Sequence, residues 1–182
     1  IEKKGLKIAV KSVSQSIRMG NKIKLNIIGD GPQKEEIKNL VNELGLDKHV
    51  NFYGILKHRE FIKECYNNHL MIVPSQVDKK TKETEGGAPT VLIEAHATGL
   101  PIIATDHADI PEIVIKDKSG FIVREGDIEA MSQSINKIYS NSVLLGEMGI
   151  FGRNHVKKQH DMKHINYRLE KLYKLAIEKN TK

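Results

Sequence analysis

The sequence predicts an α/β fold in which helices cover both faces of a parallel sheet. Two observations lead to this class. Apolar residues with helical spacing alternate along the chain with short apolar strands. The chain also has 182 residues, the size of one ordinary α/β domain, and 39% of them are hydrophobic, which is enough to build a core.

The first half of the chain shows this alternation most regularly. Its expected elements are a helix at 5–18, a strand at 23–28, a helix that starts at Pro32, a strand at 50–54, a helix at 59–67 and a strand at 69–74. The helix after Pro32 has a stripe whose members lie three or four positions apart, namely Ile37, Leu40, Val41 and Leu44. Gly45 follows at the position where a helix C-cap favours glycine.

The second half begins with a polar loop at 75–89 and continues the alternation. Its expected elements are a helix at 90–98, a strand at 101–104, a short helix near 109–112, a strand at 120–123 and a helix after Asp127. Pro89 and Gly99 mark the two ends of the first of these helices. Asp109 with Glu112 predicts a capping box for the short helix. Asp127 caps a helix whose inward residues are Ile128, Met131, Ile135 and Ile138.

After residue 140 the sequence predicts only helix. The last apolar stripe consists of Ile165, Leu169, Leu172 and Ala176. Because there is no internal repeat and no low-complexity linker, we expect a single domain, 1–182, in which 141–182 form a helical tail.

Composition narrows the class of partner. Lysine and arginine number 29 against 23 aspartates and glutamates, and the net charge of +6 suits nucleotides, phosphates or lipid head groups. Only 5% of the residues are aromatic and none is Trp, so we expect no nucleic-acid partner. No apolar run approaches the ~20 residues that a membrane span needs.

Cysteine usage favours a reducing, cytoplasmic compartment, because the single Cys65 cannot form an internal disulfide. In a helix, Cys65 is interpreted as a packing residue. No charged-then-apolar leader precedes the first helix. Since the chain starts at Ile1 rather than Met, we expect it to be part of a longer protein.

Ligands of parallel sheets bind beyond the carboxyl ends of the strands, so the candidate residues are those that follow strands. The first candidate is the turn Gly29–Pro32. A dinucleotide fingerprint would need a third glycine where Lys34 stands, and the Gly-Lys-Ser/Thr of a P-loop is absent. The turn is therefore either a structural corner or a nucleotide contact.

The second candidate is the loop 75–89 with the helix that follows it. Fifteen residues without apolar periodicity are long for a connection in a compact domain, and such loops tend to be functional. The helix start at 90–92 offers free backbone N–H groups for a phosphate. Glu94, one turn further on, suits a pair of sugar hydroxyls, or is simply a solvated helix residue. The lysines of the loop are open to the same two interpretations.

The third candidate is the corner at 104–107, where Thr105 is placed to approach the same cleft. As metal ligands Asp106, His107 and Asp109 lack a further ligand at convincing spacing, so we expect no metal site. The histidines at 155, 160 and 164 do not share a helical face either. Glu85 and Glu94 would suit a glycosidase if their separation were right.

Together these motifs resemble the C-terminal, donor-nucleotide half of a GT-B fold glycosyltransferase, of the retaining group numbered family 4. The resemblance covers nearly the whole chain and rests on six segments in the family's order. They are Glu2–Gly5 (E-K-x-G), Ile27–Pro32 (I-I-G-x-G-P), Val50–Gly54 (V-x-F-x-G), Val73–Ser75 (x-P-S), Glu85–Thr105 (E-G…E-A…G-x-P-I-I-A) and Gly120–Val123 (G-x-I-V).

The resemblance implies a Rossmann-like sheet, with the first strand of this half and the N-terminal acceptor domain lying upstream of Ile1. It also implies roles for individual residues. The implied catalytic residues are Glu85, facing the transferred sugar, and Lys4, on the donor diphosphate. The implied substrate-binding residues are Gly31, Phe52, Ile55, Gly86, Gly87, Ala88, Thr90, Val91, Leu92 and Glu94, the last on the ribose hydroxyls.

Two departures from the family pattern stand out. Eight residues separate Glu85 from Glu94, where the family has seven, because the segment carries the pair Gly86-Gly87. The arginine that the family places before its E-K-x-G segment would lie upstream of Ile1.

The function that the resemblance implies is transfer of a hexose, with retention, from a UDP- or GDP-sugar to a saccharide or lipid-linked acceptor. It implies a role in cell-surface polysaccharide biosynthesis, no cofactor beyond the donor, and peripheral contact with the inner face of the membrane. We expect the 182-residue chain alone to transfer no sugar. The alternatives are a sugar-nucleotide epimerase or isomerase of the same fold and a non-catalytic nucleotide-binding module.

Overall fold

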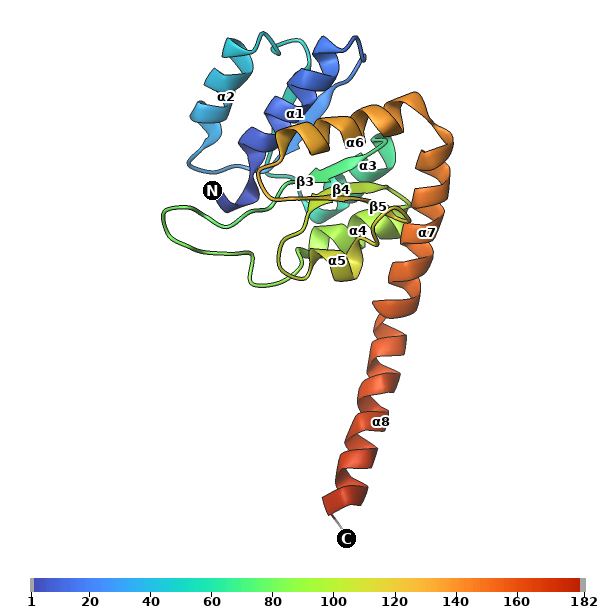
Figure 1. The fold of residues 1–182 in the computed structure, drawn as a ribbon. Helices are drawn as coiled ribbons and strands as arrows, with labels where there is room; N and C mark the ends of the chain where they lie inside the picture. The colour runs from blue at the N-terminus through green and yellow to red at the C-terminus, as the bar shows by residue number, and fades with distance from the viewer. Residues whose placement is uncertain (1, 181–182) are drawn as a thin grey trace.

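The computed structural model describes residues 2–180 and confirms the predicted fold class, with parallel strands between two layers of helices (Figure 1). The elements follow in the order η1 (Glu2–Lys4), α1 (Leu6–Arg18), β1 (Leu25–Ile28), α2 (Lys34–Glu43), β2 (Val50–Gly54), α3 (His58–Asn67), β3 (Met71–Val73), α4 (Thr90–Thr98), β4 (Ile102–Thr105), α5 (Ile110–Ile113), β5 (Gly120–Val123), α6 (Ile128–Ser140), α7 (Val143–Gln159) and α8 (Met162–Asn180).

The strands form two parallel sheets, β1–β2 and β3–β4–β5, where the sequence led us to expect one. In the larger sheet Ile102 of β4 is in register with Met71 of β3 and with Gly120 of β5. Within residues 2–180 no strand ladder joins β1 to β3. Helix α1 covers both sheets, because its Val10 packs on the β1–β2 cluster and its Val13 packs on the cluster above β4.

Strand β4 organises the main core because it is buried on both faces. Ile102 and Ala104 point into the cluster made with α3, α4, α5 and α7, whereas Ile103 points into the cluster made with α1 and α6. This alternation follows from the two-residue repeat of a strand. The cluster that contains Ile102 and Ala104 also contains Cys65. Burial raises the pKa of the Cys65 thiol to about 11, so the packing interpretation of this residue is confirmed.

Two local expectations about helix starts were wrong. The helix expected to start at Pro32 starts at Lys34, because the Lys34 amide donates to the Gly31 carbonyl and closes a turn first. Asp109 makes no side-chain cap on α5. The Glu112 amide donates to the Asp109 backbone carbonyl instead, at 3.1 Å, and Pro111 has no N–H to offer.

Other predicted caps are confirmed. Gly45 and Gly99 both adopt positive φ angles, 68° and 84°, as a helix C-cap requires. Asp127 accepts a hydrogen bond from the Ala130 amide at 2.8 Å and so caps α6.

Helix α7, the first half of the predicted helical tail, packs closely against α4. A Cβ on Gly149 would lie 2.2 Å from the Gly99 carbonyl oxygen, and one on Gly152 would lie 2.5 Å from Nδ1 of His96. His96 is fully buried, and its Nδ1 donates to the Leu100 carbonyl at 3.1 Å. Its Nε2 has no partner among the described residues.

Helix α8 projects away from the domain (Figure 1). Of the predicted stripe, Ile165, Leu169 and Leu172 are all exposed. The hydropathy of the described helices is nowhere high enough over a sufficient length to cross a bilayer.

We predict that Gly152→Ala destabilises the fold by about 1–3 kcal/mol, because the new methyl group overlaps the buried His96 ring. Gly146→Ala is the matched control in the same helix, since no atom lies within 4 Å of its added Cβ. The control should gain up to about 1 kcal/mol from helix propensity. Urea unfolding measures both values. A Gly152→Ala variant as stable as the unaltered chain would contradict this packing.

We also predict that stability falls in mild acid because of His96. Burial lowers the pKa of His96 from 6.5 to about 4 in the folded state. The unfolded chain therefore binds the proton more tightly, so this contribution is complete above about pH 6.5 and is lost as the pH falls toward about 4, by up to about 3 kcal/mol. Urea unfolding at several pH values tests this. His96→Asn should flatten the profile between these limits, and an unchanged slope would contradict it.

Candidate functional site

One group of polar residues lies where the chain leaves strands β3, β4 and β5. Ser75 lies just after β3, His107 just after β4 and Glu125 just after β5. Because the three strands are parallel and adjacent, their carboxyl ends share one edge of the sheet. The loop 75–89 runs along this edge, and its contacts build the site.

The N-terminal turn docks on the start of this loop. Gly5 has a φ of 61°, and a Cβ on it would lie only 1.8 Å from the Pro74 carbonyl oxygen, so only glycine permits the contact. The Gln76 amide donates to the Lys3 carbonyl at 2.9 Å, and its side chain donates to the Glu2 carbonyl at 3.1 Å. The segment Glu2–Gly5 is thereby held against the loop.

This docking brings together the two residues expected to be catalytic. Lys4 Nζ lies 2.7 Å from Glu85 Oε2, although the residues are 81 positions apart in the chain. Ser75 Oγ donates to the other carboxylate oxygen of Glu85 at 3.2 Å. The Glu85 side chain is only 7% exposed, whereas that of Lys4 is 50% exposed. An anionic ligand can therefore reach Lys4 from solvent.

His107 and Glu125 hold the same loop from behind. The Glu85 amide donates to Nε2 of His107 at 3.1 Å, and Nδ1 of His107 lies 2.6 Å from Glu125. The second oxygen of Glu125 accepts from the Val77 amide at 2.9 Å. Burial alone would raise the pKa of Glu125, but the bonds from His107 and Val77 outweigh it and lower that pKa. Thr105 Oγ1 donates to the Ser75 carbonyl, and its side chain is fully buried, so Thr105 fastens the start of the loop; its predicted approach to the cleft stays a prediction.

Sequence reasoning missed the role of this pair. It considered His107 only as a metal ligand and did not single out Glu125. The signal was present for both, because each follows a strand at the edge where ligands bind. Within residues 2–180 no three His, Cys, Asp or Glu side chains are arranged to hold a metal ion.

The rest of the loop carries the glycine pair. Gly86 has a φ of 74° and open space around it. A Cβ on Gly87 would lie 3.6 Å from a carboxylate oxygen of Asp109. Ala88 packs on the core cluster that contains Ile102 and Ala104. The left-handed Gly86 lets the chain accommodate a turn immediately after Glu85.

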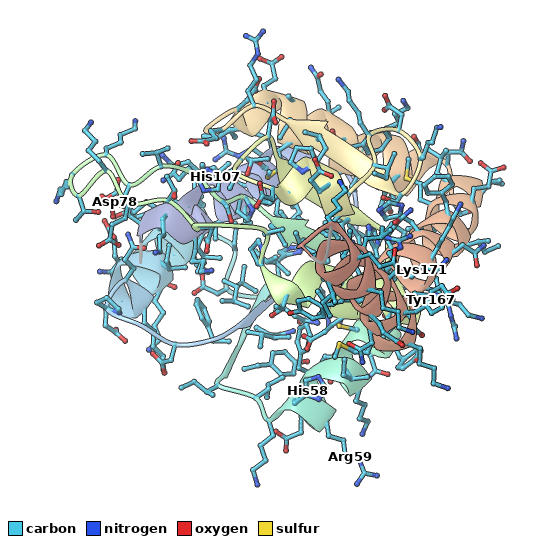
Figure 2. All side chains as sticks on the ribbon, turned by 90° about the horizontal axis from the view of Figure 1, so that it is seen from below. His58, Arg59, Asp78, His107, Tyr167 and Lys171 are labelled. Carbon is cyan, nitrogen blue, oxygen red and sulfur yellow. The ribbon has the colours of Figure 1, made fainter. Side chains whose placement is uncertain are left out.

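Glu94 belongs to a second group of residues on helices α3 and α4. Its carboxylate lies 3.1 Å from Nε2 of His58, at the start of α3, and its side chain is half-buried. Sequence reasoning also missed His58. In Figure 2 the labelled residues His58 and His107 are well separated in the view from below. No hydrogen bond or ion pair joins Glu85 to Glu94 in the described part of the chain.

The start of α4 offers fewer free amides than expected. The Leu92 amide donates to the Pro89 carbonyl at 3.1 Å, and the Leu92 side chain is fully buried. The amides of Thr90 and Val91 belong to the first turn, where a helix has no partner of its own to offer them. These two are the better candidates for a phosphate.

The turn after β1 lies beside the end of β2, because the Gly29 amide donates to the Gly54 carbonyl at 2.7 Å. The Gly31 amide donates to the Asp30 carboxylate at 2.7 Å. Hydrogen bonds from Lys34 and from the Gly31 amide lower the pKa of Asp30.

Beyond β2, Ile55 is 82% exposed, while Phe52 is half-buried. An apolar side chain this exposed beside a polar turn is available to contact the flat face of a ligand.

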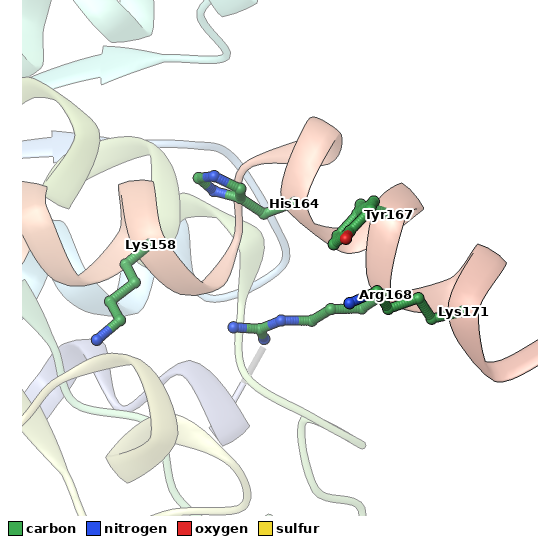
Figure 3. Close-up of a pocket in the computed structure, with 5 residues that line it drawn as sticks. All are labelled: Lys158, His164, Tyr167, Arg168 and Lys171. Carbon is green, nitrogen blue, oxygen red and sulfur yellow. The ribbon is translucent and has the colours of Figure 1, made fainter.

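A separate basic hollow lies at the junction of α7 and α8 (Figure 3). It has a volume of about 270 Å³ and is lined by Lys158, His164, Tyr167, Arg168 and Lys171. Two of its cations have partners, since Lys171 lies over the Tyr167 ring and Arg168 donates to Gln159. It contains none of the predicted site residues.

Comparison with known proteins gives a family match. The model of the family Glycosyl transferases group 1 matches residues 1–172. WcaL, a glycosyltransferase assigned to colanic acid biosynthesis in Escherichia coli, is 33% identical over 134 residues, which are 74% of this chain and 32% of that protein. The amylovoran biosynthesis glycosyltransferase AmsK of Erwinia amylovora is 26% identical over 167 residues, 92% of this chain and 40% of that protein. The chain thus spans less than half of these relatives.

The fold has a solved counterpart as well. S. aureus TarM, in complex with fondaparinux, alpha-GlcNAc-glycerol and UDP, is similar with a TM-score of 0.83 and 21% identity, over 95% of this chain and 33% of that one. This likeness confirms the predicted fold class, the C-terminal half of a GT-B fold.

Proposed function

The chain belongs to the family of glycosyl transferases group 1, and on that premise we propose that it binds the nucleoside-diphosphate sugar donor. The observation that carries the proposal is the cluster of Lys4, Glu85 and Ser75 at the carboxyl edge of the sheet. It places a solvent-accessible cation beside a largely buried carboxylate. A donor presents a diphosphate next to a sugar ring that carries hydroxyls. The diphosphate is complementary to the Lys4 cation, and the hydroxyls are complementary to the Glu85 carboxylate.

We assign the diphosphate to Lys4 and to the Thr90 and Val91 amides at the start of α4. A cation and a helix N-terminus both stabilise the charge that develops on a nucleoside-diphosphate leaving group. Glu85 then faces the transferred sugar. No metal and no further cofactor is required in this assignment.

We assign the nucleoside to the other side of the site. Glu94, which is paired with His58, accepts hydrogen bonds from the ribose hydroxyls. The base binds against the surface formed by Gly31, Phe52 and Ile55. The base is uracil or guanine. The complex of the similar TarM with UDP supports the first of these.

The whole enzyme, in this proposal, transfers a hexose with retention to a saccharide or lipid-linked acceptor, as family 4 enzymes do. The acceptor binds to an N-terminal domain, and closure of the two domains excludes water. The names of WcaL and AmsK support a role in building a cell-surface polysaccharide. The net charge of +6 suits peripheral work at the anionic inner face of a membrane.

We predict that the two glutamates act on different parts of the donor. Glu94→Gln should weaken binding of UDP or GDP by roughly 1.5–3 kcal/mol, because a charged hydrogen bond to the ribose is lost. Glu85→Gln should weaken only the intact nucleotide sugar, since its carboxylate faces the sugar. Calorimetry of both variants with UDP, UDP-glucose, GDP and GDP-mannose measures this.

The control for both variants is Glu170→Gln, which removes an exposed carboxylate paired with Lys174 on α8. It should leave all four affinities unchanged. If Glu85→Gln weakens the sugar-free nucleotides as much as Glu94→Gln does, the division of roles is wrong. If the unaltered chain binds none of the four, the proposed function itself fails.

Lys4→Ala is predicted to weaken the diphosphate by about 1–3 kcal/mol and to leave the bare nucleoside unaffected, because only the diphosphate carries charge for Lys4 to meet. Lys7→Ala is the matched control, since Lys7 is a similarly exposed lysine that pairs with Glu36. The measurement is calorimetry with UDP against uridine, and with GDP against guanosine. Equal losses for nucleoside and nucleoside diphosphate would exclude Lys4 as a phosphate ligand.

A further inference from the structure

His107 is a buried titratable residue that the proposed donor contacts do not use. Its side chain is 2% exposed, so no ligand touches it from solvent. Both of its ring nitrogens nevertheless have partners, Glu125 on one side and the Glu85 amide on the other. A buried imidazole with two polar partners at the edge of a site fixes the positions of those partners relative to each other.

The hydrogen bonds determine which nitrogen carries the proton. The Glu85 amide can only donate, so Nε2 of His107 must accept. Nδ1 therefore carries the hydrogen and donates it to the Glu125 carboxylate. Glu125 thus selects the tautomer that can hold the Glu85 backbone.

The pair also links the two ends of the loop 75–89. Glu125 accepts from the Val77 amide near the start of the loop, and His107 accepts from the Glu85 amide near its end. The contact between His107 and Glu125 closes this chain of bonds. The segment between Val77 and Glu85 is largely exposed, and Lys3 contacts it as well, at the Thr84 carbonyl (3.1 Å) and the Glu83 carboxylate (3.6 Å). Of these contacts, the bond to His107 is the one made by the Glu85 backbone itself.

The Glu85 carboxylate has a less permanent anchor. It bonds to Lys4 and Ser75, and Lys4 is the cation that the donor phosphates would attract. Once Lys4 turns to a phosphate, the Ser75 hydroxyl and the backbone bond to His107 remain to hold Glu85. The position of Glu85 in the loaded site then depends on His107.

We propose that His107 is a positioning residue for Glu85, which it holds, with Glu125, in the place where the carboxylate meets the transferred sugar. This inference rests on the proposed function of the site. His107 acts through the Glu85 backbone and contacts no part of the donor.

The test compares two substitutions at one position. His107→Phe keeps a ring but has no acceptor, whereas His107→Gln keeps a carbonyl oxygen near the place of Nε2. Binding of UDP and of UDP-glucose, or of GDP and GDP-mannose if the chain prefers guanine, is measured by calorimetry on the 182-residue chain. Ile138→Ala controls for loss of stability, because Ile138 is buried in the core cluster of α1 and α6, which includes no residue of the loop 75–89 or of α4.

We expect His107→Phe to lower the affinity for the nucleotide sugar about tenfold and that for the nucleoside diphosphate less than about threefold. His107→Gln should restore the nucleotide-sugar affinity to within about threefold of the unaltered chain. Equal losses with both ligands, equal losses in Ile138→Ala, or no loss at all would each overturn the proposal.

Hydrogen exchange of the Glu85 amide gives a readout that needs no ligand. The amide should exchange at least about tenfold faster in His107→Phe and near the original rate in His107→Gln. An unchanged rate in His107→Phe would overturn the proposal, even if the variant bound the donor poorly. Conversely, a chain that binds no nucleotide but shows the faster exchange would contradict the proposed function and not the hold of His107 on Glu85.

Discussion

The close approach of Gly5 to the Pro74 carbonyl is the contact on which the site depends. A side chain at Gly5 would overlap that carbonyl, and the positive φ of Gly5 turns the chain from η1 into α1 at this point. With the turn seated there, Lys4 reaches Glu85 and the Lys3 backbone reaches Gln76. A glycine that carries no chemistry therefore brings the proposed phosphate ligand to the proposed sugar ligand.

The parallel sheet supplies the remaining alignment. Because β3, β4 and β5 run in one direction, the residues that follow them, Ser75, His107 and Glu125, emerge at one edge. Strand β4 holds this edge in place, since it is buried between two core clusters. The site is thus a loop fastened to a rigid scaffold, and this arrangement keeps a largely exposed segment within the small tolerance that ligand recognition needs.

Buried polar groups are treated differently at the site and in the core. At the site the carboxylates of Glu85 and Glu125 are compensated by Lys4, by His107 and by backbone amides, and charge there remains available to a ligand. Between α4 and α7, the Leu100 carbonyl is the one hydrogen-bond partner of the His96 ring within residues 2–180, and burial favours the neutral form of the ring. The first arrangement is suited to binding and the second to packing.

The order and type of the elements, and the motif residues of the family, follow from the amino-acid sequence alone. Periodicity and caps are local, so the helix that ends at Gly99 and the cap at Asp127 could be predicted from their neighbours alone. The pairing of Lys4 with Glu85 and the bond from the Glu85 amide to His107 arise from the way the chain folds in space. Those partners lie 81 and 22 positions apart, and no periodic pattern encodes such a pairing. It arises because parallel strands deliver their following residues to one edge, and because Gly5 can pack where no larger residue fits.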